Sequence, residues 1–319
     1  MKLKQLIPTN LQEEKEKFFA DFSYNPQFVY ENEIDESKLH EYGLPEDTIL
    51  SIAKEIVSKA YLNRNELDIK MNEGPVISEK EVTDKFLSFL KLHNLEKRYR
   101  VVWSSSFITR AAILQDLIKL KSGSEFRRDG LTGLLYHEIG THALRRVNYE
   151  KQPWFKRKKK YGFSNYLPTE EGLAVLHSLL PLRYKSAYSS ALRYQAVEYA
   201  QTHSFSELWS YLSRYIDNFD TRWMVTFRQK RGVSDTSKPG GFTKDLVYFK
   251  GVVEVFQWLN NHNFNLEALY FGKLSYKDVD KALQLNPGFT PLLPSFYEVN
   301  KEEYAENMRE VGELNNLIY

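Results

Sequence analysis

The 319-residue sequence contains no cysteine, which excludes disulfide bonds, thiolate metal sites and cysteine nucleophiles. It also lacks an excess of one charge: the formal net charge is +2, so no overall field points to nucleic acid. No apolar run reaches the roughly 18 residues of a membrane-spanning helix, and the first ten residues lack the apolar stretch of a secretory signal. We therefore expect a cytoplasmic protein that binds neither membranes nor nucleic acid.

The composition that remains is that of an ordinary globular protein, with 42% hydrophobic and 27% charged residues. Residues 46–62 carry apolar side chains at helical spacing, and Ser78 with Glu81 forms a capping box that opens a second helix. Three short β-prone runs follow, at residues 98–105, 107–115 and 116–123. The sequence thus predicts a mostly helical α+β fold. We expect an N-terminal helical lobe over 1–97 and a catalytic domain over 98–319, or one continuous domain.

Two stretches carry residues that suit a metal. LTGLLYHEIGTHALRRVN at 131–148 contains His137, Glu138 and His142, and TEEGLAVLH at 169–177 contains Glu171. Zinc binds His nitrogen and carboxylate oxygen, and a catalytic zinc site keeps one position open for water. The metal lowers the pKa of that water toward neutrality and makes it a usable nucleophile. The pattern indicates a hydrolytic zinc site.

The spacing of the two histidines is unusual, because zinc peptidases commonly place the pair at i and i+4 on one helix face. In a regular α-helix a separation of five residues leaves the two rings about 140° apart, too far round to share one metal. A wider π-type turn brings residue i+5 back to the same face, and such turns occur at functional sites. We predict a π-bulge across Ile139–Thr141, eased by Gly140. The alternative is that His137 and His142 are two unrelated core histidines.

HEIGTH at 137–142 and EEGLA at 170–174 together resemble the metallopeptidase family that includes the microtubule-associated tyrosine carboxypeptidases. The bacterial members of that family have a Gln-Glu-Gly-Leu-Ala motif, in which glutamine stands at the position of Glu170. Softer matches lie elsewhere in the chain, at 24–30, 109–113, 231–251 and 270–275.

The resemblance implies a thermolysin-like (gluzincin-type) core with a small sheet beside the active-site helix. It implies one Zn²⁺ per chain, bound by His137, His142 and Glu171, with Glu138 as general base. It also implies removal of a C-terminal residue, and tyrosine as the preferred residue rests on the resemblance alone.

The neighbours of these residues permit two interpretations each. Thr169 suits the N-cap of a helix, which would put both glutamates in its first turn. We expect Glu170 to be either a partner of the metal ligands or solvated, and His177 to be a packing histidine or such a partner. The basic run KRKKK at 156–160 is typical of a solvated loop, but it can also flank the cleft and favour acidic protein tails such as those of tubulin.

Further residues could bind the substrate. Residues 108–115 are the strand expected to pair with the substrate backbone, and Arg110 lies on it, facing the cleft or a surface ion pair. A carboxypeptidase must also hold a terminal carboxylate, which arginine binds bidentately and lysine as a point charge. Tyr248 could donate to the developing oxyanion. Each side chain could equally serve in the core or in a salt bridge. The carboxylate-binding candidates are Arg222, Arg228, Arg231 and Lys244.

The sequence is therefore interpreted as that of a zinc metallocarboxypeptidase that shortens the C-terminal tail of a peptide or protein. Two alternatives stay open. An endo- or aminopeptidase could use the same zinc site, and the chain could be a catalytically silent, zinc-binding regulatory module. The presence of Glu138 argues against the silent module, since a structural zinc needs no general base.

Overall fold

The computed structural model describes residues 3–105 and 110–318 of the chain. Over these residues helices dominate, and the strands are short and form a two-stranded and a three-stranded sheet. The expectation of a mostly helical α+β fold is confirmed. Within the described ranges, no helix is both long enough and apolar enough to cross a membrane.

The chain divides into two compact units, each built from two separate stretches. Unit 1 comprises Met1–Leu67 and Tyr188–Phe249, and unit 2 comprises Asp68–Ala187 and Lys250–Tyr319. This division differs from the boundary expected at residue 97. The chain leaves each unit and later returns to it.

Unit 1 is helical and has an aromatic core. Phe18 packs edge-on against Phe205 and Trp209, with ring centroids 4.9 and 5.1 Å apart. Another buried interface joins α2 and α8, where the apolar face expected for residues 46–62 is buried. The elements of this unit are η1 (Leu3–Leu6), α1 (Leu11–Ala20), η2 (Glu36–His40), α2 (Asp47–Tyr61), α8 (Tyr188–Ala200), α9 (Phe205–Leu212), α10 (Phe219–Lys230) and η5 (Thr243–Asp245).

The sheets belong to unit 2. In the larger one, β4 (Leu117–Lys121) is central, with β2 (Arg100–Ser104) parallel to it on one side and β3 (Ala111–Ile113) antiparallel on the other. The three β-prone runs of the sequence therefore contain strands, although β3 is shorter than expected and residues 107–109 of its run lie outside the described ranges. The smaller sheet pairs β1 (Val76–Ile77) with β5 (Phe126–Arg127).

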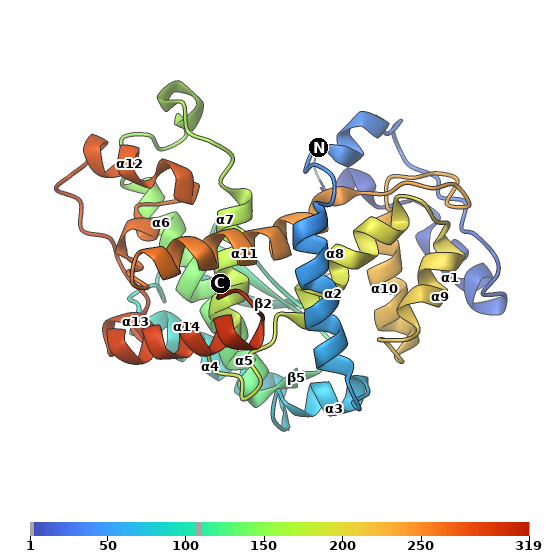
Figure 1. Cartoon of the computed structure of the whole chain (residues 1–319), viewed down its shortest axis with the longest axis horizontal. Coiled ribbons are helices and arrows are strands. Elements are labelled where there is room, and N and C mark those ends of the chain that lie inside the picture. The colour runs from blue at the N-terminus through green and yellow to red at the C-terminus, as the bar shows by residue number, and fades with distance from the viewer. Residues whose placement is uncertain (1–2, 106–109, 319) are drawn as a thin grey trace. The chain divides into compact units, whose positions relative to one another are not determined.

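The helices of unit 2 surround a long helix that changes its winding twice. It begins as α5 (Arg128–Leu135), widens into the π-helix η3 (Tyr136–Ala143), and ends as α6 (Leu144–Glu150). The capping box at Ser78 is present at the start of α4. Two helices, α3 (Glu66–Met71) and α11 (Leu246–Asn261), contain residues of both units (Figure 1). The remaining elements of unit 2 are α4 (Glu79–Leu92), η4 (Lys158–Tyr161), α7 (Leu167–Leu179), η6 (Glu267–Tyr270), η7 (Tyr276–Asp278), α12 (Val279–Leu285), α13 (Ser295–Glu298) and α14 (Lys301–Leu314).

Three glycines fix α7 beside its neighbours. A Cβ on Gly172, the glycine of EEGLA, would collide with the backbone of Gly251 in α11, and a Cβ on Gly133 in α5 would collide with the carbonyl of Ser178 in α7. The helices therefore pack backbone against backbone at these points. Because α7 is held this close, its first turns face η3, and the two motifs found in the sequence come together.

Candidate metal centre

The helix that carries HEIGTH is wound as a π-helix, as the spacing of its histidines predicts. The π-type winding extends over Tyr136–Ala143, which is longer than the expected bulge. It places His137 and His142 on one face, with ring centroids 4.8 Å apart. Gly140 serves packing here, since a Cβ at this position would lie 2.7 Å from the ring of Phe296.

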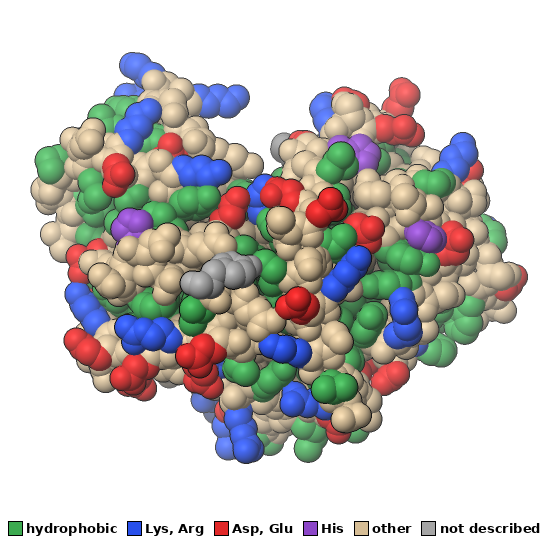
Figure 2. All heavy atoms as spheres, viewed as in Figure 1, with side chains coloured by type: hydrophobic (Ala, Val, Ile, Leu, Met, Phe, Trp, Pro, Cys, Tyr) green, Lys and Arg blue, Asp and Glu red, His purple; other side chains and the backbone are tan. Residues whose placement is uncertain are grey.

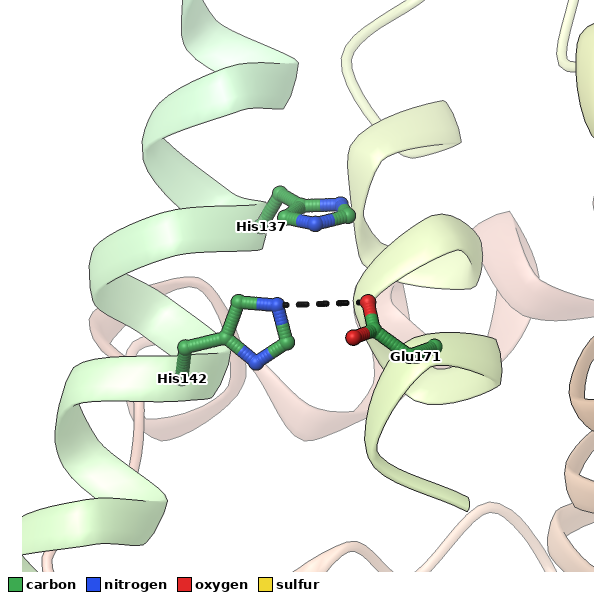
Figure 3. A group of neighbouring side chains, drawn as sticks. All are labelled: His137, His142 and Glu171. Carbon is green, nitrogen blue, oxygen red and sulfur yellow. Dashed lines mark ion pairs between the residues drawn. The ribbon is translucent and has the colours of Figure 1, made fainter. Parts of the chain in front are cut away.

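Glu171 completes a group of three metal-binding side chains. One ligand atom from each of His137, His142 and Glu171 lies within 4.8 Å of the others, and all three side chains are partly buried. Nε2 of His142 is 3.7 Å from a carboxylate oxygen of Glu171 (Figure 3). Two imidazoles and a carboxylate that converge in this way match the donor set of a catalytic zinc site.

Glu171 is brought there by a helix that begins earlier than expected. The helix α7 starts at Leu167, so Thr169 is not its N-cap; the Thr169 hydroxyl instead accepts the N–H of Tyr276. The expectation failed because proline is accepted in the first turn of a helix, where its missing N–H is not needed, so the helix begins ahead of Pro168. Glu171 therefore lies about one turn further into the helix than it would if Thr169 were the N-cap.

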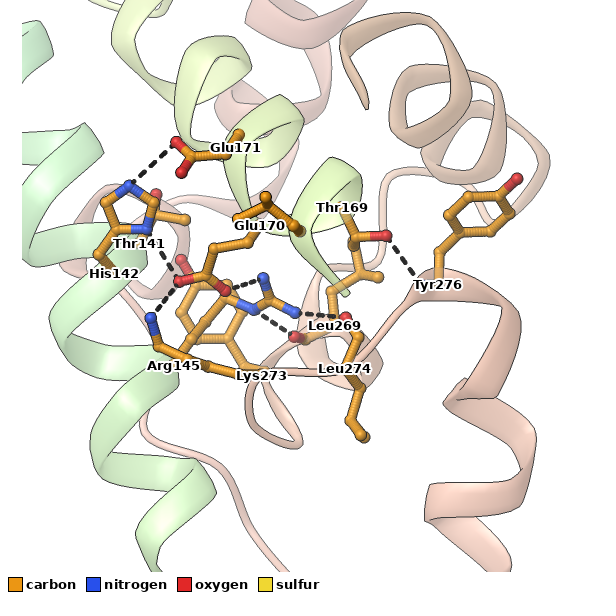
Figure 4. Close-up of polar contacts among 12 residues, drawn as sticks. Thr141, His142, Arg145, Thr169, Glu170, Glu171, Leu269, Lys273, Leu274 and Tyr276 are labelled. Atoms are coloured by element: carbon orange, nitrogen blue, oxygen red, sulfur yellow. Dashed lines mark hydrogen bonds and ion pairs between the residues drawn. The ribbon is translucent and has the colours of Figure 1, made fainter. Parts of the chain in front are cut away.

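Glu170 is buried and fixes the orientation of His142. Nδ1 of His142 lies 2.8 Å from one oxygen of Glu170, so that ring nitrogen carries the proton and Nε2 faces Glu171. Lys273 Nζ binds the same oxygen at 2.7 Å, and Arg145 donates to the other (Figure 4). Burial opposes ionisation of Glu170, but these two cations hold its pKa well below the usual range. The solvated alternative for Glu170 is therefore wrong.

The first histidine is neutral and is held by the same motif. Burial, reinforced by nearby His142, keeps the pKa of His137 well below its usual value, and a hydrogen bond joins its ring to the backbone of Ala174. A histidine must be neutral to bind a metal. EEGLA thus supplies Glu171 itself, the partner of His142 and the partner of His137.

Glu138 lies on η3 next to β3, an outer strand of the three-stranded sheet. The residue is only 7% exposed, and this burial raises its pKa; its carboxyl group accepts a hydrogen bond from the backbone N–H of Ile113 in β3. Since Leu114 and Arg110 make the backbone hydrogen bonds to β4, the N–H and C=O groups of Ala111 and Ile113 point away from β4. The Ile113 N–H donates to Glu138, and the other outward-facing groups of this edge strand are of the kind that can bind an extended peptide.

Arg110 lies just before this strand and is exposed. Its guanidinium is 3.6 Å from the carboxylate of Glu73, and about half of the side chain remains in contact with solvent. Of its two expected roles, the surface ion pair is the one observed. Such pairs contribute little to stability, which leaves the guanidinium available for other contacts.

The carboxylate-binding candidates are in unit 1. Among them Arg222 and Arg231 are buried, and the side chain of Arg228 is 14% exposed. Arg228 forms a two-pronged ion pair with Asp245, at 3.0 and 2.6 Å. Arg222 donates to the carbonyl of Ile216 and lies over the Trp209 ring, and Arg231 lies over the ring of Phe242. Lys244 and Tyr248 are partly exposed and also interact with neighbours. Tyr248 contributes to raising the pKa of Arg228.

The basic run at 156–160 has two parts. Lys158 turns inward: its Nζ donates to the carbonyl of Lys273 and lies 3.2 Å from the centre of the Tyr166 ring. Burial lowers the pKa of Lys158 to about 8. The other four side chains are exposed. Figure 2 shows Lys and Arg side chains projecting from the segment between α6 and α7.

Sequence reasoning missed two of the residues that support the ligands. Arg145 and Lys273 hold Glu170 but have no motif of their own in the residue pattern. The one available signal for Arg145 is its position three residues after His142 on the same helix, where side chains share a face. Lys273 comes from a distant turn, and only the fold brings it to Glu170.

Comparison with known proteins agrees with these observations. A family model described as microtubule-associated tyrosine carboxypeptidase matches residues 18–287. The mouse protein named microtubule-associated tyrosine carboxypeptidase 1 is 30% identical over 324 residues, which cover 98% of this chain and 68% of that protein. Mouse "putative tyrosine carboxypeptidase MATCAP2" is 31% identical over 331 residues, covering 99% of this chain and 62% of that protein. The chain thus spans about two thirds of the length of these relatives, and it belongs to the microtubule-associated tyrosine carboxypeptidase family.

Proposed function

We propose that this chain is a zinc-dependent carboxypeptidase that removes a C-terminal residue from a peptide or protein tail. The observation that carries the proposal is the convergence of His137, His142 and Glu171 beside the buried carboxyl group of Glu138. The names of its relatives support the reaction type, since they are called tyrosine carboxypeptidases.

The residues present fit a zinc ion. His137 is neutral, Glu170 directs Nε2 of His142 toward Glu171, and the three donors leave room in a four-coordinate site for one further ligand. A zinc ion held there would polarise a substrate carbonyl and lower the pKa of a water molecule that it binds. We expect one ion per chain.

Glu138 would act as the general base and then as the general acid. It lies next to the first zinc ligand on the same helix, and burial raises its pKa toward the value at which a carboxyl group exchanges protons efficiently near neutral pH. In the first step it takes a proton from the attacking water. In the second it gives that proton to the leaving amine, so the group ends the cycle as it began.

The free edge of β3 would hold the substrate backbone. Ile113 donates its N–H to Glu138, and the neighbouring backbone groups of Ala111 point the same way, so an extended peptide paired there would lie along the general base. An active-site helix beside the edge strand of a small sheet is the arrangement that we propose as thermolysin-like.

A carboxypeptidase needs groups that bind the terminal carboxylate of its substrate. The side chains of Arg222, Arg228 and Arg231 are largely buried, so we propose the more exposed Lys244 and Arg110 as carboxylate partners. Tyr248 is proposed as the donor to the oxyanion. The relatives are named for microtubules and tyrosine. We therefore propose a tubulin-like acidic tail ending in tyrosine as substrate, and the cytoplasm as location.

The test is zinc analysis combined with mass-spectrometric digestion of peptides that end in different residues, for wild type and Glu138→Gln. The proposal expects one zinc per chain in both proteins, and loss of a single C-terminal residue in wild type alone. Cleavage within the peptide or at its N-terminus would favour an endo- or aminopeptidase. Bound zinc without any cleavage would favour the silent regulatory module, and absence of zinc would overturn the proposal.

A further inference from the structure

The π-type winding of η3 rearranges the backbone hydrogen bonds of the helix, and two carbonyls of η3 accept hydrogen bonds from side chains. The hydroxyl of Thr141 donates to the carbonyl of Tyr136 at 2.9 Å, across five residues. The hydroxyl of Tyr270 donates to the carbonyl of Gly140. Both donors are fully buried, so neither carbonyl can rely on water. The first of these bonds spans the turn that ends just before His142.

Thr141 is in turn linked to the C-terminal helix α14 through His177. Oγ1 of Thr141 is 2.8 Å from Nδ1 of His177, and Nε2 of His177 is 3.1 Å from the hydroxyl of Tyr304 in α14. His177 is completely buried, and Tyr304 is 2% exposed. Three elements that are distant in sequence, η3, α7 and α14, are thus joined by one row of hydrogen bonds.

The direction of every bond in this row follows from its last acceptor. The carbonyl of Tyr136 can only accept, so the single hydroxyl hydrogen of Thr141 points to it. Thr141 must then accept from Nδ1–H of His177. Burial lowers the pKa of His177 to about 3, so the ring is neutral and its Nε2 accepts from Tyr304. Every hydrogen bond in the row therefore pairs one donor with one acceptor.

The surroundings of the row leave it little freedom. The ring of Phe296 in α13 lies 4.9 Å from that of His177 and also fills the space against Gly140. The residues on α13 and α14 lie beyond residue 287, where the match to the family model ends. The C-terminal helices therefore contact the HEIGTH segment from outside the region that the family model describes.

We propose that Tyr304, His177 and Thr141 are positioning residues through which α14 holds η3 in its π-type winding and keeps His137 and His142 on one face. This inference rests on the proposed zinc site. None of the three residues is a metal ligand or touches the substrate in this proposal. Loss of the row lets η3 relax toward ordinary α-helical winding, which turns the two rings apart.

The experiment measures zinc affinity by chelator competition and records the visible spectrum of the Co²⁺-substituted protein, which reports ligand geometry. Thr141→Val removes the hydroxyl at nearly constant volume, Thr141→Ser retains it, and Tyr304→Phe removes the far end of the row. Tyr297→Phe is the matched control, because Tyr297 is also buried in the C-terminal region but its hydroxyl accepts from the backbone of Leu266.

We expect Thr141→Val and Tyr304→Phe to weaken zinc binding about tenfold or more and to shift the Co²⁺ spectrum. Thr141→Ser and Tyr297→Phe should resemble wild type in both measurements. Wild-type affinity and an unshifted spectrum in Thr141→Val and Tyr304→Phe would overturn the inference while leaving the proposed function intact. Absence of zinc binding in the wild type itself would instead overturn the proposed function.

Discussion

Two groups of ionisable side chains in this molecule direct their polar atoms in opposite ways. In unit 2, His137, His142 and Glu171 turn their donor atoms toward one another, at distances suited to a metal. In unit 1, the guanidinium groups of Arg222 and Arg228 are held by backbone carbonyls and by the carboxylate of Asp245, and that of Arg231 lies over the ring of Phe242. The comparison teaches that clustered polar residues indicate a site when their binding atoms converge, and indicate structural support when each already has its own partner.

We expect His142→Ala to give the largest difference between the metal-binding group and the arginine group. This change removes one zinc ligand, and we expect zinc binding and peptidase activity to be lost. The apo protein should lose only about 1 kcal/mol of unfolding free energy, since Glu170 keeps Arg145 and Lys273 as partners. Elemental analysis and urea unfolding measure the two quantities. Retention of zinc would show that the ligands are wrongly assigned.

Asp245→Asn should show the reverse pattern in unit 1. It leaves the largely buried Arg228 without its ion partner, which should cost about 3–5 kcal/mol of unfolding free energy, while we expect the folded protein to keep its zinc. Zinc content of the folded fraction and denaturant unfolding are the measurements. Loss of zinc together with little loss of stability would mean that the arginine group serves the site.

The same ion pair has a pH signature. Burial would raise the pKa of Asp245, but Arg228 holds it well below its usual range. A carboxyl group with a depressed folded-state pKa stabilises the fold above its unfolded pKa of about 4, and this stabilisation is lost as the pH falls below that value. The unfolding free energy of Asp245→Asn should therefore fall less steeply than that of the wild type as the pH drops below the unfolded pKa. An equally steep fall would contradict the pairing.

A smaller effect is expected at Glu170. This residue is paired with charged groups inside the fold, and it also orients a metal ligand. Glu170→Ala should weaken zinc binding about 10- to 100-fold, because the ring of His142 loses its orienting acceptor. Glu170→Gln keeps an acceptor oxygen and restores the glutamine of the bacterial motif, so it should lose less. Competition with a chromophoric chelator ranks the three proteins. Equal affinity in all three would show that His142 needs no orienting partner.

How much of this could be predicted from the sequence differs between the two units. HEIGTH and EEGLA carried the ligand assignment because they are local, and the i, i+5 spacing required the π-type winding that is observed. The partners of Glu170 could not be predicted, since Lys273 reaches it only through the fold. The partner of Arg228 could not be predicted either, because Asp245 lies outside the short stretch 222–231 that contains the three arginines.

The basic segment at 156–160 should show the smallest effect. It tests the comparison within five residues, because it contains both an inward-turned lysine with its own partners and exposed lysines. Lys158 is turned inward, whereas Lys156, Lys159 and Lys160 are exposed. Replacing the three exposed lysines with glutamine should weaken binding of an acidic tail by about 0.2–1 kcal/mol per charge, and less at high salt. A neutral peptide ending in the same residue should be unaffected. Peptidase assays at two salt concentrations separate the cases. Equal effects on both peptides would mean that the exposed lysines do not interact with the charge of the substrate, and that this segment is only a solvated loop.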